Sequence, residues 1–442
     1  MKLKNHVIET IKLALPISFG QLGHVSMGVV DSMMVGVIGA IPLAASSLVN
    51  GIFFLVMVIG IGLSMAATPL IAMNKGSKKY EECGKIFNNS LIVNFSFSIV
   101  LMIFVYILSF LIPFMNQPKE VVKEAVPFLQ VLSFSVIPFM LFQTYRQYLE
   151  GLSIPIPPMV IALTANILNA ILNWIFIYGN FGMPALGLYG SGLSTTISRW
   201  VMAISLVYFV KKYQKVKIFH PELRFSLFEM NLVKRLLNIG LPSGLQYFLE
   251  VAAFSFAAIM LGWMGSENLA AHQIAINLAS ITYMIILGIG YAGSIRVGEF
   301  LGAGSVKNIR TAGFTAHGLT FCLMLIFGIM FILFREQLVH LYIKDFSVIK
   351  IAENLIIVAA FFQIFDGMQA TGVGILRGLT DVKIPLIASL FSYWVIGIPI
   401  AAFLGFYFDL GAVGVWIGLL ISLAVLGISM LIRFHNRTKI KL

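Results

Sequence analysis

Long runs of apolar residues, separated by short polar stretches, recur along the whole chain of 442 residues. An α-helix needs about 20 apolar residues to cross a hydrocarbon layer about 30 Å thick, because each residue advances roughly 1.5 Å. The segments that meet this requirement are 11–38, 42–73, 86–113, 124–148, 158–178, 188–210, 236–264, 268–295, 312–334, 351–376, 385–407 and 412–432. We therefore expect an all-α integral membrane protein with twelve transmembrane helices.

The charged residues agree with a membrane protein and indicate its orientation. They make up 11% of the chain, whereas a soluble domain carries about 25%. Most of the 30 Lys and Arg residues lie near the two ends of the chain and in the loops after even-numbered spans. The positive-inside rule then places both termini in the cytoplasm. The net charge of +12 is explained by loops that face anionic lipid, and we expect no nucleic-acid partner.

Neither the N-terminal sequence nor the cysteines indicate a secreted protein. MKLKNHVIETIKLALP opens a long apolar run with an early proline and no small-residue cleavage site, so we interpret it as a first span and not as a removable signal. Cys83 and Cys322 alone do not predict a disulfide framework.

The two halves of the chain repeat each other. LALP, ending at Pro16, matches IGLP, ending at Pro242, 226 residues later, and further pairs keep nearly this offset: GAIPLAAS with GSENLAAH, IGIG with LGIG, and LEGLSIPIPPM with LRGLTDVKIPL. Six spans in each half give the halves the same orientation. We predict two pseudo-symmetric six-helix lobes, 1–210 and 236–442, joined by a basic cytoplasmic linker, 211–235. Channels and enzymes can be duplicated too, but this arrangement favours alternating access.

Three acidic residues lie deep within the spans, namely Asp31, Glu250 and Asp366. A carboxylate at this depth costs about 2.5 to 3.5 kcal/mol or more, so it normally faces a bundle interior or a wet cavity and serves a function there. Glu250 and Asp366 both lie about 16 to 23 Å from the same membrane surface, judged from the helix rise. Two acids in one pocket can share protons or hold a hard cation, and the sequence leaves both open.

Several sequence motifs carry a family resemblance. VDSMMVG in the first span, LAAHQIAIN, RVGEFLGAG, LNWIFIYGNFGMPALGLYGSGLST and LRGLTDVKIP occur in order over nearly the whole chain. Together they resemble the multidrug and toxic compound extrusion family, in particular its NorM-type bacterial branch. The resemblance implies a transporter in the bacterial cytoplasmic (inner) membrane. It also implies that small organic cations are exported in exchange for inward-moving Na⁺ or H⁺, with no cofactor besides the coupling ion.

The resemblance also assigns roles to the three buried acids. Glu250 in QYFLEVAAF and Asp366 in FQIFDGMQA match the carboxylates that form the cation site of the second lobe, so they are the candidate metal ligands. The relatives carry a tyrosine one turn before the aspartate, where this chain has Phe362. Asp31 matches the first-lobe carboxylate and would take up a proton, an ion or a cationic substrate.

Other polar residues are candidates for the lining of the two sites. Asn166, Asn169 and Asn173 form one stripe on the fifth span, and the family places asparagines of LNAILNW near its first-lobe aspartate. Hydrogen bonds between helices are the alternative role. The remaining candidates are His24, on the helix face of Asp31, and Gln246, Gln273 and Asn277 in the second lobe.

Arg199 lies in the middle of a span, and we expect it to neutralise a buried carboxylate that the sequence does not name. The prolines at 16 and 242 can bend the first helix of each lobe. GIGYAG resembles a dinucleotide motif but lies inside an apolar span with no preceding strand.

Cation-coupled efflux is the function that these observations favour. A lipid-linked oligosaccharide flippase is the alternative, although a diphosphate head group calls for basic residues in the cavity. No Walker loop, HExxH motif or nucleophile motif occurs, so we do not expect an enzyme. We expect a monomer.

Overall fold

The computed structural model describes residues 2–220 and 227–439, apart from the side chain of His24. These residues form helices, and within them no strand occurs. In this part of the chain 11 helices are long and apolar enough to cross a membrane. A further pair, bent by 43° at a short break, gives up to 12 spans. The predicted all-α fold with twelve spans is confirmed.

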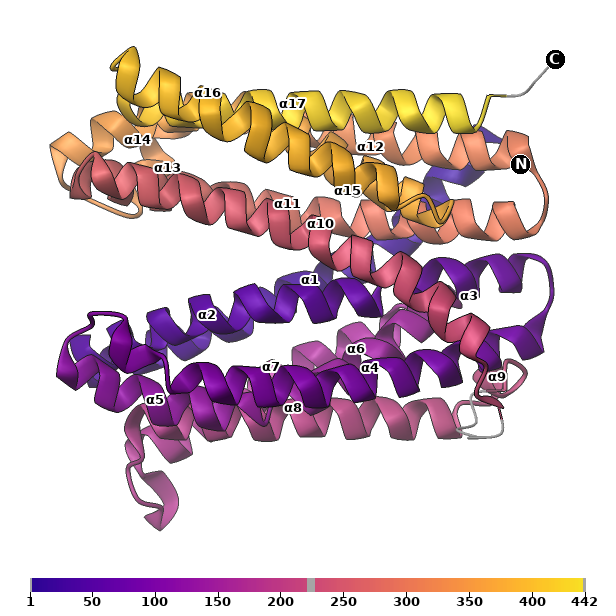
Figure 1. The fold of residues 1–442 in the computed structure, drawn as a ribbon, viewed down its shortest axis with the longest axis horizontal. Coiled ribbons are helices and arrows are strands. Elements are labelled where there is room, and N and C mark those ends of the chain that lie inside the picture. The colour runs from indigo at the N-terminus through magenta and orange to yellow at the C-terminus, as the bar shows by residue number, and fades with distance from the viewer. Residues whose placement is uncertain (1, 221–226, 440–442) are drawn as a thin grey trace. The chain divides into compact units, whose positions relative to one another are not determined.

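The helices follow one another along the chain with short connections (Figure 1). Their bounds are α1 (Leu3–Ile38), α2 (Ala40–Ser64), α3 (Ala67–Gly76), α4 (Tyr80–Ser109), α5 (Lys119–Ser133), α6 (Val136–Gly151), α7 (Ile156–Tyr178), α8 (Gly187–Lys212), α9 (Gln214–Lys217), α10 (Met230–Trp263), α11 (Ser266–Gly302), α12 (Val306–Leu333), α13 (Arg335–His340), α14 (Phe346–Gly378), α15 (Lys383–Leu390), α16 (Ile398–Ala402) and α17 (Gly411–Arg437). The bent pair is α5 and α6. Two π-helical segments, η4 (Phe391–Gly397) and η5 (Phe403–Tyr407), flank α16.

The turns after the first helix of each half show the repeat at the level of backbone geometry. Gly39, between α1 and α2, has φ of 139°, and Gly265, between α10 and α11, has φ of 113°. L-residues with a side chain rarely adopt such angles, so both turns require glycine. The two glycines are 226 residues apart, the same offset as the two prolines.

The chain forms two compact units, and their bounds differ from the predicted lobes. Unit 1 consists of Met1–Ser18 and Leu245–Leu442, and unit 2 of Phe19–Gly244. The predicted division was 1–210, 211–235 and 236–442, so α1 and α10 are each shared between two units. The division falls two residues after Pro16 and Pro242, which lie inside these helices. A proline removes one backbone hydrogen bond, which gives each helix a point at which it can change direction.

Close helix contacts explain why the helix starts belong to these units. In unit 2, a Cβ on Gly62 of α2 would clash with the backbone of Gly244 of α10. In unit 1, a Cβ on Gly288 of α11 would clash with Ser18 and with the backbone of Ala14 in α1. Ser18 Oγ also donates a hydrogen bond of 2.7 Å to the carbonyl of Ile285. The periodicity of the sequence predicts where the helices are, but it does not predict which helix each helix end packs against.

The predicted linker is tied to unit 2 on both sides of residues 221–226, which lie outside the described chain. Before this gap, Tyr148 donates a 3.4 Å hydrogen bond to the carbonyl of Phe219. After it, Asn89 of α4 donates to the carbonyl of Leu227 and accepts from the amide of Glu229, both at 2.9 Å. The described parts of 211–235 therefore belong to the packed structure of unit 2.

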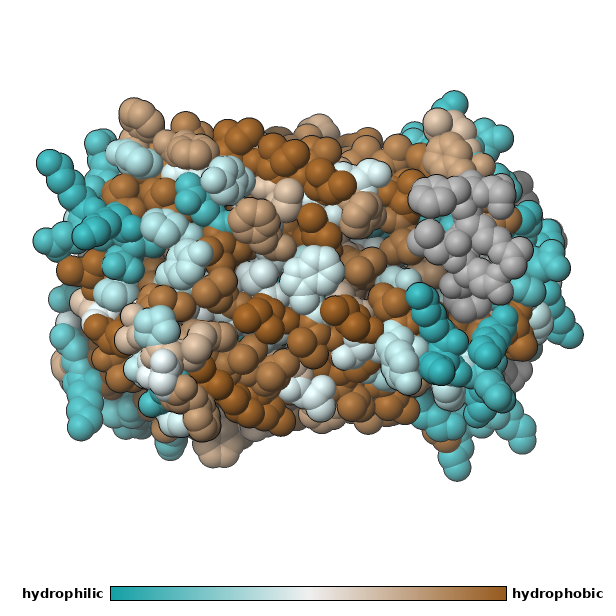
Figure 2. Space-filling view, turned by 90° about the horizontal axis from the view of Figure 1, so that it is seen from below, coloured by the Kyte–Doolittle hydropathy of each residue, from teal (hydrophilic) through white to brown (hydrophobic). Residues whose placement is uncertain are grey.

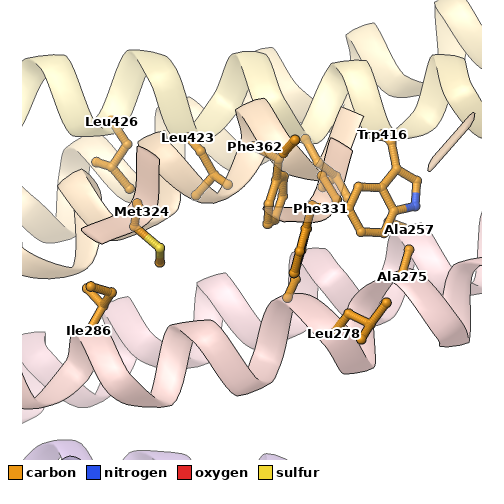
Figure 3. Packing of buried hydrophobic residues seen from close by; sticks show 14 of the residues in the cluster. Ala257, Ala275, Leu278, Ile286, Met324, Phe331, Phe362, Trp416, Leu423 and Leu426 are labelled. Carbon is orange, nitrogen blue, oxygen red and sulfur yellow. The ribbon is translucent and has the colours of Figure 1, made fainter. Parts of the chain in front are cut away.

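Each unit has its own apolar core. In unit 1, Phe362 of α14 and Trp416 of α17 lie side by side among leucine, isoleucine and methionine side chains (Figure 3). In unit 2, Val49, Leu129 and Met140 are among the residues that fill the corresponding space. On the face shown in Figure 2, hydrophobic side chains form a broad band with hydrophilic side chains at both margins, the distribution expected of a protein in lipid.

Candidate ion and substrate sites

The carboxylate of Asp31 is held by side chains from α7 and α8 in unit 2. Asn173 Nδ2 donates to Asp31 Oδ1 at 2.5 Å, and Thr195 Oγ1 donates to Asp31 Oδ2 at 3.1 Å. Asn169 lies beside both donors, because its Nδ2 is 3.5 Å from Thr195 Oγ1 and its Oδ1 accepts from Asn173 at 3.3 Å. Asn169 and Asn173 are buried, whereas Asp31 is half-buried. The site thus combines one acid with neutral hydrogen-bond donors.

The asparagine stripe of α7 serves both of the roles that the sequence allowed. Asn173 binds the acid, as described. Asn166 Nδ2 instead donates to the carbonyl of Gly23 in α1 at 2.6 Å and so links two helices. Tyr178, at the end of α7, does the same through a 2.8 Å hydrogen bond to the carbonyl of Met34. These backbone contacts hold α1 beside α7 on both sides of Asp31.

Arg199 lies one turn after Thr195 on α8, and Thr195 binds Asp31, so Arg199 lies on the helix that supplies part of this site. Within the described chain Arg199 and Asp31 form no direct ion pair. Arg199 Nη1 donates to Ser135 Oγ at 2.6 Å, and its guanidinium carbon lies 5.1 Å from the ring centre of Phe53 and 5.0 Å from that of Phe139. His24, the other first-lobe candidate, has a side chain outside the described part of the structure.

Glu250 of α10 accepts hydrogen bonds from three helices of unit 1. Tyr283 of α11 donates to Oε1 at 3.0 Å, while Gln369 of α14 and Gln246 of α10 donate to Oε2 at 3.0 and 3.2 Å. Hydrogen bonds to a charged group are stronger than those between neutral groups. The three donors fix the position of the carboxylate in the interior of unit 1, where Glu250 is only 5% exposed.

Asp366 of α14 is also buried in unit 1, three residues before the Gln369 that binds Glu250, but it lacks such partners. It is 6% exposed, and none of the described residues donates a hydrogen bond to it. The hydroxyl of Tyr393, on the π-helical segment η4, is likewise buried without a hydrogen-bond partner among the described residues. The Tyr393 ring centre lies 6.2 Å from that of Phe254, which is one turn after Glu250 on α10. This part of unit 1 therefore contains two acids and a hydroxyl with unused hydrogen-bonding capacity.

Phe362, one turn before Asp366, is a packing residue. Its ring centre lies 5.9 Å from that of Phe254 and 5.2 Å from that of Trp416 (Figure 3). The tyrosine hydroxyl that the family resemblance led us to consider is absent, and apolar contacts occupy this position.

The remaining second-lobe candidates separate into two groups. Gln246 binds Glu250, as described above. Gln273 and Asn277 instead bind each other, with Gln273 Nε2 3.0 Å from Asn277 Oδ1, on the more exposed face of α11. They form one polar spot on α11 that is separate from the Glu250 hydrogen bonds.

Three donors were missed at the sequence level. Gln369 follows Asp366 by three residues, so a search for polar residues one turn from each buried acid finds it. The same search finds Gln246, four residues before Glu250. Tyr283 and Thr195 lie on other helices than the acids they bind, and no local pattern marks them. Their identification needs the packing of one helix against another.

A buried ion pair lies outside both sites. Arg146 Nε is 2.6 Å from Glu150 Oε1 on α6, and both side chains are almost completely buried. Charge is thus balanced locally there. In the described part of the chain no group of three or more His, Cys, Asp or Glu side chains is arranged to hold a metal ion. A monovalent ion or protons fit the pair of acids in unit 1 better than a transition metal.

The chain is similar to known membrane transporters over nearly its whole length. The MatE family model matches residues 16–175 and 242–403. The multidrug resistance protein NorM of Photobacterium profundum is 32% identical over 437 residues, which cover 97% of this chain and 94% of that protein. The multidrug resistance protein MdtK of Yersinia pseudotuberculosis is 32% identical over 441 residues, 98% of this chain and 96% of the relative.

Solved structures show the same fold. The Vibrio cholerae MATE transporter VcmN in its bent form matches with a TM-score of 0.88 at 20% identity, over 99% of this chain and 98% of that one. The eukaryotic MATE transporter AtDTX14 matches with a TM-score of 0.88 at 21% identity, over 99% and 100% of the two chains. With its two family-model matches and its full-length relatives, the chain belongs to the MatE family, whose members are membrane transporters and not enzymes.

Proposed function

We propose that this protein is a secondary active antiporter that exports small organic cations in exchange for inward-moving Na⁺ or H⁺. Relatives named as multidrug resistance proteins support efflux of several compounds. The observation that carries the proposal is the set of three membrane-embedded carboxylates with no direct ion-pair partner in the described chain, one in unit 2 and two in unit 1. Membrane burial of such groups is costly unless a cation or proton joins them.

The pair in unit 1 suits the coupling ion. Glu250 and Asp366 repel each other when both are ionised, and this repulsion is relieved by one proton or one monovalent cation. Their carboxylate oxygens, the Tyr393 hydroxyl and the buried, unpaired Oε1 of Gln369 are the oxygen ligands that Na⁺ would use. Protonation of either acid is the alternative that the same groups allow, and no further cofactor is needed.

Asp31 suits a role with the organic cation or with a proton in unit 2. Its carboxylate keeps partial exposure, and its partners Asn173 and Thr195 are neutral donors. An anionic group with fixed orientation attracts a positively charged, amphipathic compound. The many Met and Phe side chains of the chain, 21 and 37 in number, provide adaptable apolar surface for its hydrophobic part.

Alternating access joins these sites in one cycle. A transporter that exposes its sites alternately to the two sides exchanges ligands when each ligand prefers a different state. Inward-moving cations that bind the acids then promote release of the exported compound. The cycle is proposed for a monomer in the bacterial inner membrane with both termini in the cytoplasm.

The experiment is transport of a fluorescent organic cation by proteoliposomes, with Na⁺ and proton gradients imposed separately. We expect transport with at least one gradient and its loss in Glu250→Gln and Asp366→Asn. Glu336→Gln, which removes a charge from exposed α13, is the matched control and should keep full activity. Full activity in both acid variants would refute the proposal. If neither the Na⁺ gradient nor the proton gradient drives transport, the proposal is also refuted, and the flippase alternative becomes the one to test.

A further inference from the structure

Arg296 of α11 binds the first turns of α1 inside unit 1. Its Nη1 donates to Thr10 Oγ1 at 2.8 Å and to the backbone carbonyl of His6, and its Nη2 lies 3.1 Å from His6 Nδ1. Arg296 is 3% exposed, and His6 and Thr10 are completely buried. The proposed transport cycle uses none of these three residues. Their contacts join the start of the first helix to the last turns of α11.

The contact between Arg296 and the imidazole determines the protonation state of His6. A guanidinium stays positively charged and only donates hydrogen bonds. His6 Nδ1 must therefore accept through its lone pair, which it has when the ring is neutral and carries its proton on Nε2. We assign this tautomer to His6. A proton on Nδ1 would remove the acceptor and leave two positive groups with nitrogens 3.1 Å apart.

The other contacts of the cluster are also made with a neutral ring. The hydroxyl of Thr10 donates to the carbonyl of His6 at 2.8 Å, so its lone pair is free to accept from Arg296. The ring of Phe300 lies 5.5 Å from that of His6, and the guanidinium carbon of Arg296 lies 5.6 Å from the same Phe300 ring. These contacts place the imidazole and the guanidinium side by side without a negative group between them.

The other charged side chains nearby do not bind the imidazole. They are Lys2, Lys4, Glu9 and Lys12 on α1, Glu299 on α11 and Lys307 on α12. The four lysines are exposed, and Glu9 pairs with Lys12 at 2.9 Å. Asn308, near the start of α12, is neutral. In the described part of the chain no carboxylate forms an ion pair with His6, so Arg296 is the charged group in contact with its ring.

We propose that His6 and Arg296 form a pH-sensitive latch, which holds the start of α1 on α11 while His6 is neutral and releases it when His6 takes up a proton. Histidine is the side chain whose charge ordinarily changes between about pH 5 and 8. Proton uptake removes the acceptor for Arg296 and adds repulsion between like charges. Both effects favour the attached state at higher pH and weaken it as the pH falls.

The latch acts on the helix that carries Asp31. Residues of α1 up to Ser18 belong to unit 1, and those from Phe19 onward belong to unit 2. The second attachment of α1 to α11 is the hydrogen bond from Ser18 to the carbonyl of Ile285, which has no titratable group. Protonation of His6 therefore releases the first turns of α1 only. The inference goes beyond the proposed antiport and holds for either coupling ion.

The test is amide hydrogen/deuterium exchange of the purified full-length protein at about pH 8 and about pH 5, followed in peptides that cover residues 7–13 and 14–20. Each rate is divided by that of the same peptide when unfolded, which removes the intrinsic pH dependence of exchange. We expect residues 7–13 to exchange about tenfold or more faster at the lower pH, because a hydrogen bond to a charged group is lost. Residues 14–20 should keep their protection.

Two variants separate His6 from the other histidines. His6→Asn keeps an acceptor near the place of Nδ1 but gains no charge, so protection of residues 7–13 should not depend on pH. His340→Asn, which removes an exposed histidine of α13, should behave as the unmodified protein. Equal protection at both pH values in the unmodified protein, or the same pH dependence in His6→Asn, would overturn the inference.

Nitrogen NMR of the imidazoles gives a second test if His6→Asn does not fold. The His6 signals are assigned as those that His6→Gln lacks. At about pH 8 we expect a neutral ring with its proton on Nε2. A proton on Nδ1 at this pH would contradict the latch, because that nitrogen could not accept from Arg296. Neither measurement involves transport, so failure of the proposed antiport would be seen separately, as inactive unmodified protein in proteoliposomes.

Discussion

Tyr283→Phe isolates one hydrogen bond at the acid pair of unit 1. The phenol is the donor to Glu250 Oε1, at 3.0 Å, while Gln246 and Gln369 both serve Oε2. The substitution removes one hydroxyl and keeps the ring, so packing on α11 is preserved. A hydrogen bond to a charged group contributes about 1.5 to 3 kcal/mol. Since about 1.4 kcal/mol equals one pH unit, the loss corresponds to about 1 to 2 pH units.

The direction follows from which form of Glu250 accepts the bond. A donated hydrogen bond stabilises the ionised carboxylate, so its loss favours protonation. We expect the pH midpoint of organic-cation transport to move upward by about 1 to 2 units in Tyr283→Phe. The assay is initial transport rate in proteoliposomes at a series of pH values. Tyr407→Phe, on the exposed surface of η5, is the control. An unchanged or lowered midpoint in Tyr283→Phe would refute the reasoning.

Three further predictions concern the framework. Gly62→Val should destabilise the protein by about 1 to 3 kcal/mol or more, because the new side chain meets α10 at Gly244; thermal melting checks this against Gly28→Val, where nothing lies within 4 Å. Arg146→Met should cost about 3 to 5 kcal/mol, and adding Glu150→Gln should restore much of it, as a double-mutant cycle of melting would show. Asn89→Ala should lower stability by about 1 to 3 kcal/mol, since it removes the hydrogen bonds that hold residues 227–229, and an unchanged melting temperature would contradict this anchoring.

The sequence predicted the spans because a membrane leaves few alternatives. Once a chain carries such apolar runs, each must form a helix to satisfy its backbone, and length alone gives the number of crossings. The repeat between Pro16 and Pro242 was likewise visible. The boundaries of the compact units were not, because they depend on where Gly62 and Gly288 allow another helix to approach. Such contacts are properties of pairs of helices, whereas a hydropathy pattern describes one helix at a time.

The candidate site residues also divide into those that one helix reveals and those that only contacts between helices reveal. Asp31, Glu250 and Asp366 could be identified as candidate residues from the sequence because a charge in an apolar run is conspicuous. Asn173 was found because it belongs to a stripe on one helix face. Thr195 was missed, since a threonine in a membrane helix usually bonds its own backbone and only the packing of α8 on α1 makes it a partner of Asp31. Helix spacing identifies neighbours on one helix, and the cross-helix half of each site requires the structure.

Phe362→Tyr tests whether the acid pair can use an added hydroxyl. Phe362 is 1% exposed and stands one turn before Asp366, which has no hydrogen-bond donor among the described residues. A hydroxyl that reaches Asp366 gains a partner and offers Na⁺ another oxygen ligand. A hydroxyl left unpaired in this apolar contact costs about 1 to 3 kcal/mol.

Melting temperature and the Na⁺ dependence of transport distinguish a paired hydroxyl from an unpaired one. If the hydroxyl reaches Asp366, we expect the melting temperature to stay near that of the unmodified protein. The Na⁺ concentration needed for half-maximal transport should then fall about fivefold, the equivalent of about 1 kcal/mol. Phe434→Tyr, at a fully buried ring near the end of α17, controls for an added buried hydroxyl away from the acid pair. The opposite result is a destabilised Phe362→Tyr variant whose transport depends on Na⁺ as in the unmodified protein. The side chain at position 362 would then contact only its apolar neighbours. The coupling ion would have to bind through Glu250, Asp366 and the groups already beside them.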